Sequence, residues 1–480
     1  MIALTAAEIA AVTGGVLHAL DASTLLAGPV VSDSREVVPG ALFVAIAGER
    51  SDGHAFAAAA VAAGARAVLA AHEVTADDGT PVPTVVVPDV VAALGALARE
   101  VLARLRMAAA EPGGSALKVV AVTGSVGKTT TKDLLLQLLG SVGPTIAPVR
   151  SFNNEIGLPL TVLRADEDTR YLVLEMGASG IGHIAYLTGI APPDVAIVLV
   201  VGAAHVGQFG GLEATARAKS ELVTGLVPEG VAVLNADDDR VAAMAALTPA
   251  EVVTFGLSSD AQVQAVDVRL VDGGHPQLTL LDARGPEPRS APVRLRLVGE
   301  HHVHNALAAA AAALVVGLDL ATVADGLAGA EALSPHRMHV VDRPDGVTVV
   351  DDSYNANPDS MRAALKALAA LAGRQRRSVA VLGEMLELGP QARSAHDAIG
   401  RLAVRLDIGL TVVVGDGARA IADGAAQEGS WGDEVVLVDD VDAAAALLQE
   451  RLRPGDVVLV KSSYGAGLWR LGDRLLEVQA

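Results

Sequence analysis

The stretch VVAVTGSVGKTT, residues 119–130, decides the fold of this chain. Its apolar run predicts a buried strand, and the pattern of residues 130–140 that follows predicts a helix. The turn between them is rich in glycine, which lets backbone N–H groups approach an anion, and the helix N-terminus adds a favourable dipole. An ordinary tight turn is the alternative, but it would not require Gly-Lys-Thr-Thr at this point. The stretch therefore predicts a phosphate-binding loop between a strand and a helix.

The residue types in this loop suggest individual roles. Lys128 can reach the terminal phosphates of a nucleotide, and the Thr129 hydroxyl is placed to bind Mg²⁺. The spacing differs from the general phosphate loop, because residue 122 is Val where the first glycine of that pattern would fall. The residues expected to surround the phosphates are Gly124, Ser125, Val126, Gly127, Lys128, Thr129 and Thr130.

Strands and helices alternate outward from this loop as far as residue 333. Apolar runs that predict further strands occupy 171–177, 194–202 and 231–237. The apolar segment 304–317 predicts a buried helix that ends at a glycine. Uninterrupted apolar strands separated by helices are typical of a parallel sheet covered on both faces. The alternating segment 261–285 predicts an antiparallel insertion before the last helix of this block.

Smaller blocks lie on either side of this central one. The first has short apolar runs at 41–48, 67–71 and 83–87, joined by Gly, Pro and Asp turns, and it predicts a small α/β module. The last restarts the alternation of strands and helices and predicts a doubly wound, Rossmann-like domain. The length also suggests about three domains. We therefore expect an α/β protein with a P-loop parallel-sheet ATPase domain in the middle, and domain limits at 1–86, 87–333 and 334–480.

Composition and charge exclude several classes of protein. No run of 18 or more residues is strongly apolar and uncharged, which argues against a membrane span, and no signal peptide is apparent. The absence of cysteine excludes disulfides and thiolate catalysis and fits a reducing cytoplasm. The net charge of −20 argues against a nucleic-acid partner, because a phosphate backbone requires a basic surface.

Three polar residues at or beyond strand ends fit a cation site. Glu175 ends the strand run 171–175, His205 follows the run 194–202, and Lys219 lies in a helical segment. A carboxylate at a strand terminus beside a phosphate loop is a natural Mg²⁺ ligand. Each residue also has an ordinary structural explanation: a solvated strand end, a loop histidine and an exposed helix charge.

The loop and these three residues, in this order, resemble the Mur ligase family. The shortened loop T-G-x-x-G-K-T-T at 123–130 is similar to that of Mur ligases and folylpolyglutamate synthetases. These enzymes use ATP to activate a carboxylate as an acyl phosphate, which an amine then attacks. The resemblance implies that Thr129, Glu175 and His205 bind Mg²⁺ and that Lys219 is carbamylated, which gives an anionic group near the metal. It implies a catalytic set of Lys128, Glu175, His205 and Lys219.

The nucleoside side of the site is also implied by resemblance. The string 299–306 resembles the family's G-x-H-N-x-x-N-A helix start, in which Asn305 would contact adenine, although His302 stands where Asn is usual. Arg337 matches an arginine that reaches the nucleotide phosphates. Asp352, in the string D-D-S-Y-N-A-N-P, is expected to contact ribose. A helix N-cap is the structural alternative for Asn305, and a turn before proline is the alternative for D-D-S-Y-N-A-N-P.

The resemblance extends to the other substrates. Ser34 and Arg35, in the string D-S-R, resemble the uridine-diphosphate site of the family, and an exposed turn arginine is the alternative. Asn153 and Asn154 precede a Gly and Pro bend, and their amides can read both donors and acceptors of a peptide. The D-D-S-Y-N-A-N-P string supplies further expected substrate contacts, namely Tyr354, Asn355 and Asn357.

Together these strings imply one reaction class. They resemble the branch that adds D-alanyl-D-alanine to UDP-N-acetylmuramoyl-tripeptide with ATP and Mg²⁺, and they imply a cytoplasmic monomer whose domains close around the substrates. Another Mur-type or folylpolyglutamate-type ligase would share the loop, but D-D-S-Y-N-A-N-P and N-N-E-I-G count against it. A nucleotide switch that joins nothing is a further alternative, and the D-S-R module counts against it.

Overall fold

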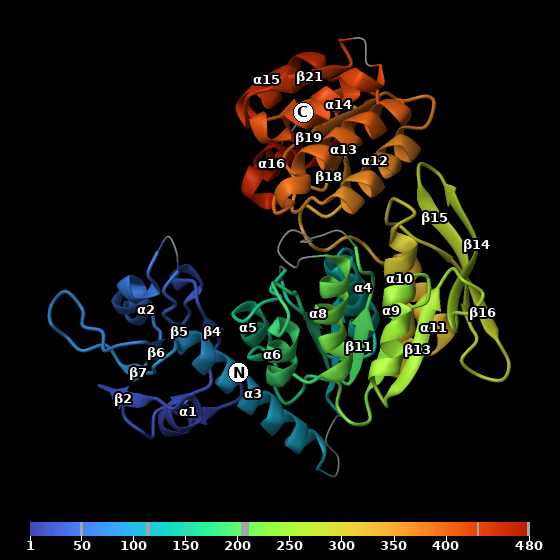
Figure 1. The fold of residues 1–480 in the computed structure, drawn as a ribbon. Helices are drawn as coiled ribbons and strands as arrows, with labels where there is room; N and C mark the ends of the chain where they lie inside the picture. The colour runs from blue at the N-terminus through green and yellow to red at the C-terminus, as the bar shows by residue number, and fades with distance from the viewer. Residues whose placement is uncertain (49–50, 112–115, 150, 203–210, 430–431, 478–480) are drawn as a thin grey trace.

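A computed structural model describes residues 1–48, 51–111, 116–149, 151–202, 211–429 and 432–477. Three α/β bodies follow one another along the chain, each built around its own main sheet (Figure 1). The predicted three-domain α/β fold is confirmed. Within the described ranges, no helix combines the length and the apolar character needed to cross a membrane.

The N-terminal body is a five-stranded sheet in the order β2-β7-β6-β5-β4. Its strands are β2 (Val16–His18), β4 (Val30–Val31), β5 (Leu42–Val44), β6 (Ala67–Ala70) and β7 (Thr84–Val86). Its helices are α1 (Ala6–Thr13) and α2 (Ala57–Ala62), and β1 (Leu4–Thr5) pairs separately with β3 (Leu25–Leu26). The strands β4 to β7 run parallel, so the loops after β4 and β5 lie at the same edge of the sheet.

The central body is a nine-stranded sheet in the order β16-β15-β14-β13-β12-β11-β8-β10-β9. Its strands are β8 (Lys118–Thr123), β9 (Thr145–Ile146), β10 (Tyr171–Glu175), β11 (Val195–Val198), β12 (Val231–Asn235), β13 (Glu251–Gly256), β14 (Val263–Val271), β15 (His275–Asp282) and β16 (Arg289–Arg294). Its helices are α4 (Lys128–Gly140), α5 (Gly157–Val162), α6 (His183–Ile190), α8 (Leu212–Thr224), α9 (Asp239–Ala242), α10 (His302–Val315) and α11 (Leu320–Gly329). The strands from β9 to β14 in this sheet pair in parallel.

Both faces of the central sheet are buried, as its apolar strands predict. In β8 the side chains of Val119 and Ala121 join one apolar core, which also contains residues of α5, α6 and α8. Val120 and Val122 join the other, with residues of α4, α10 and α11. Successive side chains of a strand point to opposite faces, so an uninterrupted apolar run is what two covered faces require.

Two details of the central body differ from the sequence-based expectation. The alternating segment 261–285 forms β14 and β15 as expected, but β16 adds a third antiparallel strand. The helix α10 is also not the last one, because α11 follows it. The short, Ala- and Gly-containing sequence of α11 gives a weak helical pattern, and its burial against α10 and α4 supplies the missing stability.

The C-terminal body is a six-stranded sheet in the order β17-β18-β22-β19-β20-β21, with β17 antiparallel at one edge. Its strands are β17 (His339–Asp342), β18 (Thr348–Asp351), β19 (Ser378–Leu382), β20 (Leu410–Val414), β21 (Val435–Val438) and β22 (Val457–Lys461). Its helices are α12 (Pro358–Ala372), α13 (Ala392–Arg405), α14 (Arg419–Glu428), α15 (Val441–Arg451) and α16 (Trp469–Glu477). Apolar cores on both faces make it doubly wound, as predicted.

Candidate functional site

A cavity of about 440 Å³ lies where the carboxyl ends of β8 and β10 meet the first loops of the C-terminal body. Most of the residues predicted to bind nucleotide or substrate line it. They are Gly124, Ser125, Val126, Gly127, Lys128, Thr129, Thr130, Asn153, Asn154, Glu175, Lys219, Asn305, Arg337, Asp352, Tyr354, Asn355 and Asn357. The fold therefore gathers residues that lie more than 200 positions apart in the sequence.

The phosphate loop leaves β8 through backbone that requires glycine. Gly124 has φ +158° and Gly127 has φ +87°, and the second residue is the N-cap of α4. A Cβ atom on Gly127 would lie 2.3 Å from Oδ1 of Asn305. The helix begins at Lys128, two residues before the expected start, so its free N–H groups face the cavity that the loop surrounds.

Lys128 is held over its own loop. Its Nζ donates a hydrogen bond to the carbonyl oxygen of Gly124 at 2.8 Å. Burial lowers the pKa of Lys128, while the negative charge of Glu175 opposes the shift and Arg337 adds to it. The ammonium is thus aimed into a cavity where an anionic ligand would stabilise its charge.

Glu175 and Thr129 form a buried group of oxygen atoms beside the loop. Glu175 is 1% exposed, so the solvated strand end weighed above is wrong. One carboxylate oxygen accepts a hydrogen bond from Thr129 Oγ1 at 3.1 Å, and the other accepts one from Asn153 Nδ2 at 2.8 Å. A hydroxyl and a carboxylate are ligands that a hard cation such as Mg²⁺ prefers. His205, the third predicted ligand, lies outside the described residues.

Lys219 enters the cavity from α8. It is 5% exposed, so the exposed helix charge considered above is wrong. Burial lowers its pKa well below the ordinary value, and the positive charge of Lys128 lowers it further. Among the described residues, no carboxylate oxygen lies within 4.0 Å of its Nζ. Burial therefore shifts the proton equilibrium of this side chain toward the neutral amine.

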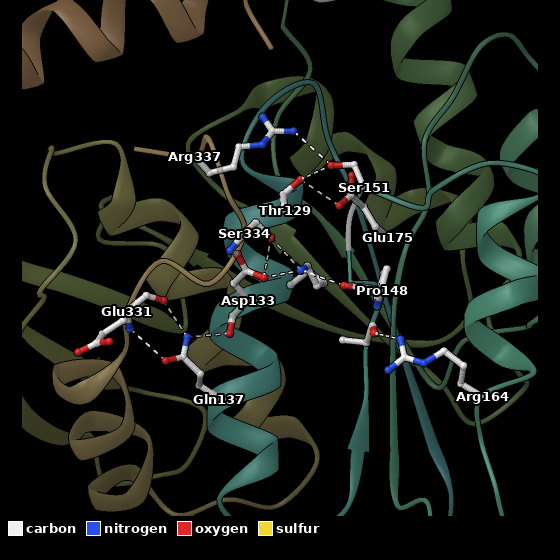
Figure 2. Close-up of polar contacts among 12 residues, drawn as sticks. Thr129, Asp133, Gln137, Pro148, Ser151, Arg164, Glu175, Glu331, Ser334 and Arg337 are labelled. Atoms are coloured by element: carbon white, nitrogen blue, oxygen red, sulfur yellow. Dashed lines mark hydrogen bonds and ion pairs between the residues drawn. The ribbon is translucent and has the colours of Figure 1, made fainter. Parts of the chain in front are cut away.

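Ser151 is a residue of the site that the sequence analysis missed. Its hydroxyl lies 3.1 Å from Oγ1 of Thr129, and Nη2 of Arg337 donates to it at 3.3 Å (Figure 2). The Arg337 guanidinium also lies over the Tyr354 ring, with Cζ 4.3 Å from the centroid. Ser151 thereby links the loop to the first arginine of the C-terminal body. Its place two residues before Asn153 was the available signal.

The C-terminal wall of the cavity is built on Asp352 and Lys461. The buried Lys461 ammonium pairs with the Asp352 carboxylate and donates to the carbonyl oxygen of Asn355 at 2.9 Å. Burial lowers the pKa of Lys461, and Asp352 opposes that shift. The Asn357 side chain accepts from the Ser360 backbone N–H at 2.9 Å and caps α12. This cap was not expected for Asn357 from the sequence, and the helix N-cap considered above for Asn305 is wrong, because Asn305 lies inside α10 and the N-cap is His301.

Two histidines at the start of α10 close the cavity on the other side. The rings of His301 and His302 lie 4.0 Å apart. Burial lowers the pKa of His301 to about 4 and that of His302 well below its ordinary value. The Asn305 side chain lies 3.4 Å from Nδ1 of His302. Neutral imidazoles here avoid adding positive charge next to Lys461.

Ser34 and Arg35 do not line this cavity. They lie on the 3-10 turn η1 (Ser34–Glu36), at the carboxyl edge of the N-terminal sheet after β4. The exposed Arg35 guanidinium donates from Nε to Asp33 at 2.9 Å. At the same edge, the buried His54 accepts from the Ala71 N–H at 2.9 Å. The fold therefore places the predicted uridine-diphosphate residues on a separate surface.

Comparison with known proteins covers all three bodies. The profiles "Mur ligase family, catalytic domain", "Mur ligase middle domain" and "Mur ligase, glutamate ligase domain" match residues 30–101, 122–313 and 336–464, respectively. The sequence is 48% identical to the UDP-N-acetylmuramoyl-tripeptide–D-alanyl-D-alanine ligase of Mycobacterium tuberculosis, over 99% of this chain and 98% of that protein.

Solved structures agree in fold over the same length. The crystal structure of MurF from Acinetobacter baumannii is similar with a TM-score of 0.84 and 32% identity, and 99% of each chain is covered. MurF from Thermotoga maritima, solved in complex with ADP, has a TM-score of 0.75 and 30% identity, covering 93% of this chain and 96% of that one.

Proposed function

The chain belongs to the Mur ligase family, and we propose that it joins D-alanyl-D-alanine to UDP-N-acetylmuramoyl-tripeptide with consumption of ATP. The product is the UDP-muramoyl-pentapeptide of peptidoglycan synthesis. The observation that carries the proposal is the cavity itself. There the phosphate loop, Glu175 and Lys219 meet Tyr354 and Asn355 of the D-D-S-Y-N-A-N-P string. A nucleotide site and the string typical of the dipeptide-adding branch thus share one enclosed space.

ATP is the nucleotide of this cavity. The Thermotoga relative that is solved with ADP supports this assignment. The free N–H groups of α4 and the Lys128 ammonium suit a triphosphate. We propose that Arg337 also faces the phosphates, that Asn305 contacts adenine and that Asp352 contacts ribose, because all three line the same cavity.

The residues present fit a Mg²⁺ ion. The Thr129 hydroxyl and the buried Glu175 carboxylate would hold it, with His205 as the third proposed ligand. When bound, the ion would neutralise charge on the phosphate oxygens. A carbamate on Lys219 is proposed for the same region, since burial lowers its pKa and so shifts it toward the neutral amine, the form that reacts with carbon dioxide.

The proposed ligase reaction proceeds in two steps. A terminal carboxylate oxygen of the tripeptide forms a bond to the γ-phosphorus of ATP while the bond to the bridging oxygen breaks, giving an acyl phosphate and ADP. The amine of D-alanyl-D-alanine then attacks the acyl carbon, the bond from this carbon to the phosphate oxygen breaks, and phosphate leaves while the nitrogen gives up one proton. Lys128 and Arg337, which line the cavity, donate to oxygens on which charge develops.

The remaining predicted contacts divide between two surfaces. We propose that Asn153, Asn154 and Tyr354 bind the peptide parts of the substrates, together with Asn355 and Asn357, and their position in the lining of the cavity supports this. Ser34 and Arg35 are proposed to hold the uridine diphosphate on the N-terminal sheet.

Further features of the protein are also proposals. We keep 1–86, 87–333 and 334–480 as the domain limits. The net charge of −20 and the absence of cysteine support a cytoplasmic protein without a nucleic-acid partner, and a monomer is the proposed state.

The test is phosphate release from ATP with UDP-muramoyl-tripeptide, with and without D-alanyl-D-alanine, followed by mass analysis of the product. Release that requires both substrates and yields the pentapeptide is the expected result. Ligation of another amino acid in place of the dipeptide would identify a different ligase of the family. Phosphate release that ignores both substrates would overturn the ligase proposal and favour a nucleotide switch.

A further inference from the structure

The segment 331–338, between α11 and β17, connects the central and C-terminal bodies, and α4 is bonded to its first half. α4 is also the helix that begins at the phosphate loop. Figure 2 shows polar side chains on one side of this helix pointing toward the connecting segment. The helix that binds the nucleotide phosphates is therefore in direct contact with the connection to the next domain.

The strongest contact is a buried cluster of Lys132, Asp133 and Ser334. The Asp133 carboxylate accepts hydrogen bonds from the backbone N–H of Ser334 at 3.0 Å and from its hydroxyl at 3.1 Å. The Lys132 ammonium pairs with Asp133 and donates to the Ser334 hydroxyl at 3.2 Å and to the carbonyl of Pro148 at 3.1 Å. The three residues are between 2% and 6% exposed.

A second contact lies one turn along α4. The Gln137 side chain donates to the carbonyl oxygen of Glu331 at 2.9 Å and accepts from its backbone N–H at 3.0 Å. α11 also packs closely on this helix, because a Cβ atom on Gly326 would lie 2.5 Å from the Leu138 side chain. Residues 331–334 are therefore fixed to α4 at both ends.

The second half of the segment is fixed to the C-terminal body instead. The carbonyl oxygen of His336 accepts from the Tyr354 N–H at 3.2 Å, and the Met338 N–H donates to Asp352 at 3.2 Å. His336 and Met338 have φ of +58° and +49°, a left-handed conformation that costs about 1 kcal/mol or more for residues with side chains. Surrounding contacts must hold such backbone in place.

Only Pro335 thus lies between the half fixed to α4, which ends at Ser334, and the half fixed to the C-terminal body, to which Arg337 belongs. Because a single residue joins the two halves, the contact between Ser334 and Asp133 fixes where the half that carries Arg337 lies relative to α4 and Ser151. A buried ion pair such as Lys132–Asp133 is seldom the most stable filling of a core, since apolar side chains often serve as well or better. The pair does, however, fix the direction of the Ser334 backbone.

We infer that Asp133, acting with Ser334, is a positioning residue that holds Arg337 over the phosphate site. This inference rests on the proposed ligase function for its kinetic part only. Without the anchor, the segment would start elsewhere, and the guanidinium would leave the phosphates. A displacement of about 1 Å in a reacting group can lower the rate on the order of 100-fold.

The experiment compares Asp133→Asn with Asp282→Asn. Asp282 is the matched control, because it is a carboxylate of the same domain that is 2% exposed and pairs with Arg284 and Arg289, which lie outside the connecting segment. Since Asp133→Asn leaves the Lys132 charge without its partner and could prevent folding, a second variant combines Gln137→Ala with Ser334→Ala. That variant removes the side-chain contacts of Gln137 and Ser334 that hold residues 331–334 to α4, and it keeps the Lys132–Asp133 ion pair.

Two readouts separate positioning from general stability. The first is the kcat of pentapeptide formation, measured alone and in the Arg337→Ala background, together with the Kd of ADP. We expect kcat to fall about tenfold or more in both anchor variants, with ADP affinity changed less than about threefold, and no further fall in the Arg337→Ala background. The Asp282→Asn variant keeps its kcat.

The second readout does not depend on catalysis. Because the chain has no cysteine, Leu247→Cys puts one spin label in the central body and Glu450→Cys puts one in the C-terminal body. Both positions are exposed. We expect the interdomain distance distribution to broaden in both anchor variants and not in Asp282→Asn. Equal kcat and equal distributions in anchor and control variants would overturn the inference, as would a full additional loss in the Arg337→Ala background. A wild-type protein that forms no pentapeptide would refute the proposed function, and the distances would still decide the anchor.

Discussion

The three lysines that line the cavity differ in how their charge is compensated. Lys461 pairs with Asp352, and Lys128 donates to the carbonyl oxygen of Gly124 and lies near Glu175. Lys219 has neither kind of partner among the described residues, and its pKa is lowered the most clearly. Carbon dioxide reacts with the neutral amine, because the ammonium form has no lone pair. Burial without a counter-charge shifts a lysine toward this neutral form.

This difference predicts a carbamate on one lysine. In ¹³C-bicarbonate the wild-type protein should show a carbamate carbon resonance that is absent from Lys219→Ala and present in Lys128→Ala. Activity of Lys219→Ala should fall about 100-fold, a typical loss for one electrostatic group at a reacting centre. A carbamate signal that persists in Lys219→Ala, or an unchanged kcat, would contradict the assignment.

The pH dependence of stability follows from His301. Its folded pKa of about 4 lies below the ordinary value of 6.5, because burial disfavours the imidazolium. Between these two values the unfolded chain binds a proton that the folded chain does not, so the free energy of unfolding falls as the pH falls from about 6.5 to about 4. The loss is on the order of 2 kcal/mol, since cavity water screens part of the ring.

The contribution of His301 can be separated from that of the carboxylates by difference. Urea unfolding of wild-type protein and His301→Gln is measured between pH 7.5 and 4.5, and the free energy of unfolding of the wild type should fall more steeply toward low pH than that of the variant. Parallel curves over this range would show that His301 is not the group responsible.

At the scale of single elements, α4 combines two tasks. Its N-terminus holds the phosphate loop, and its middle turns hold the segment that leads to the C-terminal body. The loop end depends on Gly127, whose backbone is left-handed and whose α-carbon approaches Asn305 of α10. The other end of the same helix has a glycine under no such constraint: a Cβ atom on Gly140 would meet nothing within 4 Å.

These two glycines give a matched pair of alanine substitutions. Gly127→Ala should weaken ADP binding about tenfold or more, because the left-handed backbone costs about 1–2 kcal/mol and the methyl group displaces Asn305. Gly140→Ala should leave binding unchanged and stabilise the protein by about 0.5–1 kcal/mol. Calorimetric titration with ADP and thermal unfolding measure both effects. Equal ADP affinities in the two variants would show that the loop tolerates a side chain.

Elements with strong local signals were predictable from the sequence, and contacts between distant residues were not. β8 and α4 follow from an apolar run, glycines and a helical pattern within 22 residues. By contrast, β2 and β4 are three and two residues long, too short for any periodic pattern. Ser334 looks like an ordinary loop serine, since its partner Asp133 is 201 residues away. The local sequence pattern thus predicted the phosphate loop, and only the fold revealed the contact between Asp133 of α4 and Ser334.

At the scale of the whole molecule, the three bodies are joined in different ways. The helix α3 (Val90–Ala109) lies between the N-terminal and central bodies, and apolar residues of both form one continuous core with it (Figure 1). The C-terminal body has cores of its own, in which Val298 is, among the residues that the structure describes, the one contributed by the central body. We therefore expect the N-terminal and central bodies to move together and the C-terminal body to move on its connecting segment.

Because we expect the N-terminal body to stay fixed to the central body, we predict that its substrate contacts affect the binding of the UDP substrate and leave kcat unchanged. Arg35 lies after the carboxyl end of β4, on a surface away from the ATP cavity, and a guanidinium bonded to a phosphate contributes about 1.5–3 kcal/mol. Arg35→Ala should therefore raise the KM for UDP-muramoyl-tripeptide about tenfold or more, with the kcat and the KM for ATP unchanged, since the contact is equal in ground and transition states. The control is Arg66→Ala, an exposed arginine that precedes β6 at the opposite edge of the same sheet. Steady-state kinetics with each substrate varied in turn provide the measurement. A fall in kcat without a rise in KM would mean that Arg35 takes part in domain closure. Equal KM values in the two variants would show that Arg35 does not bind the uridine diphosphate.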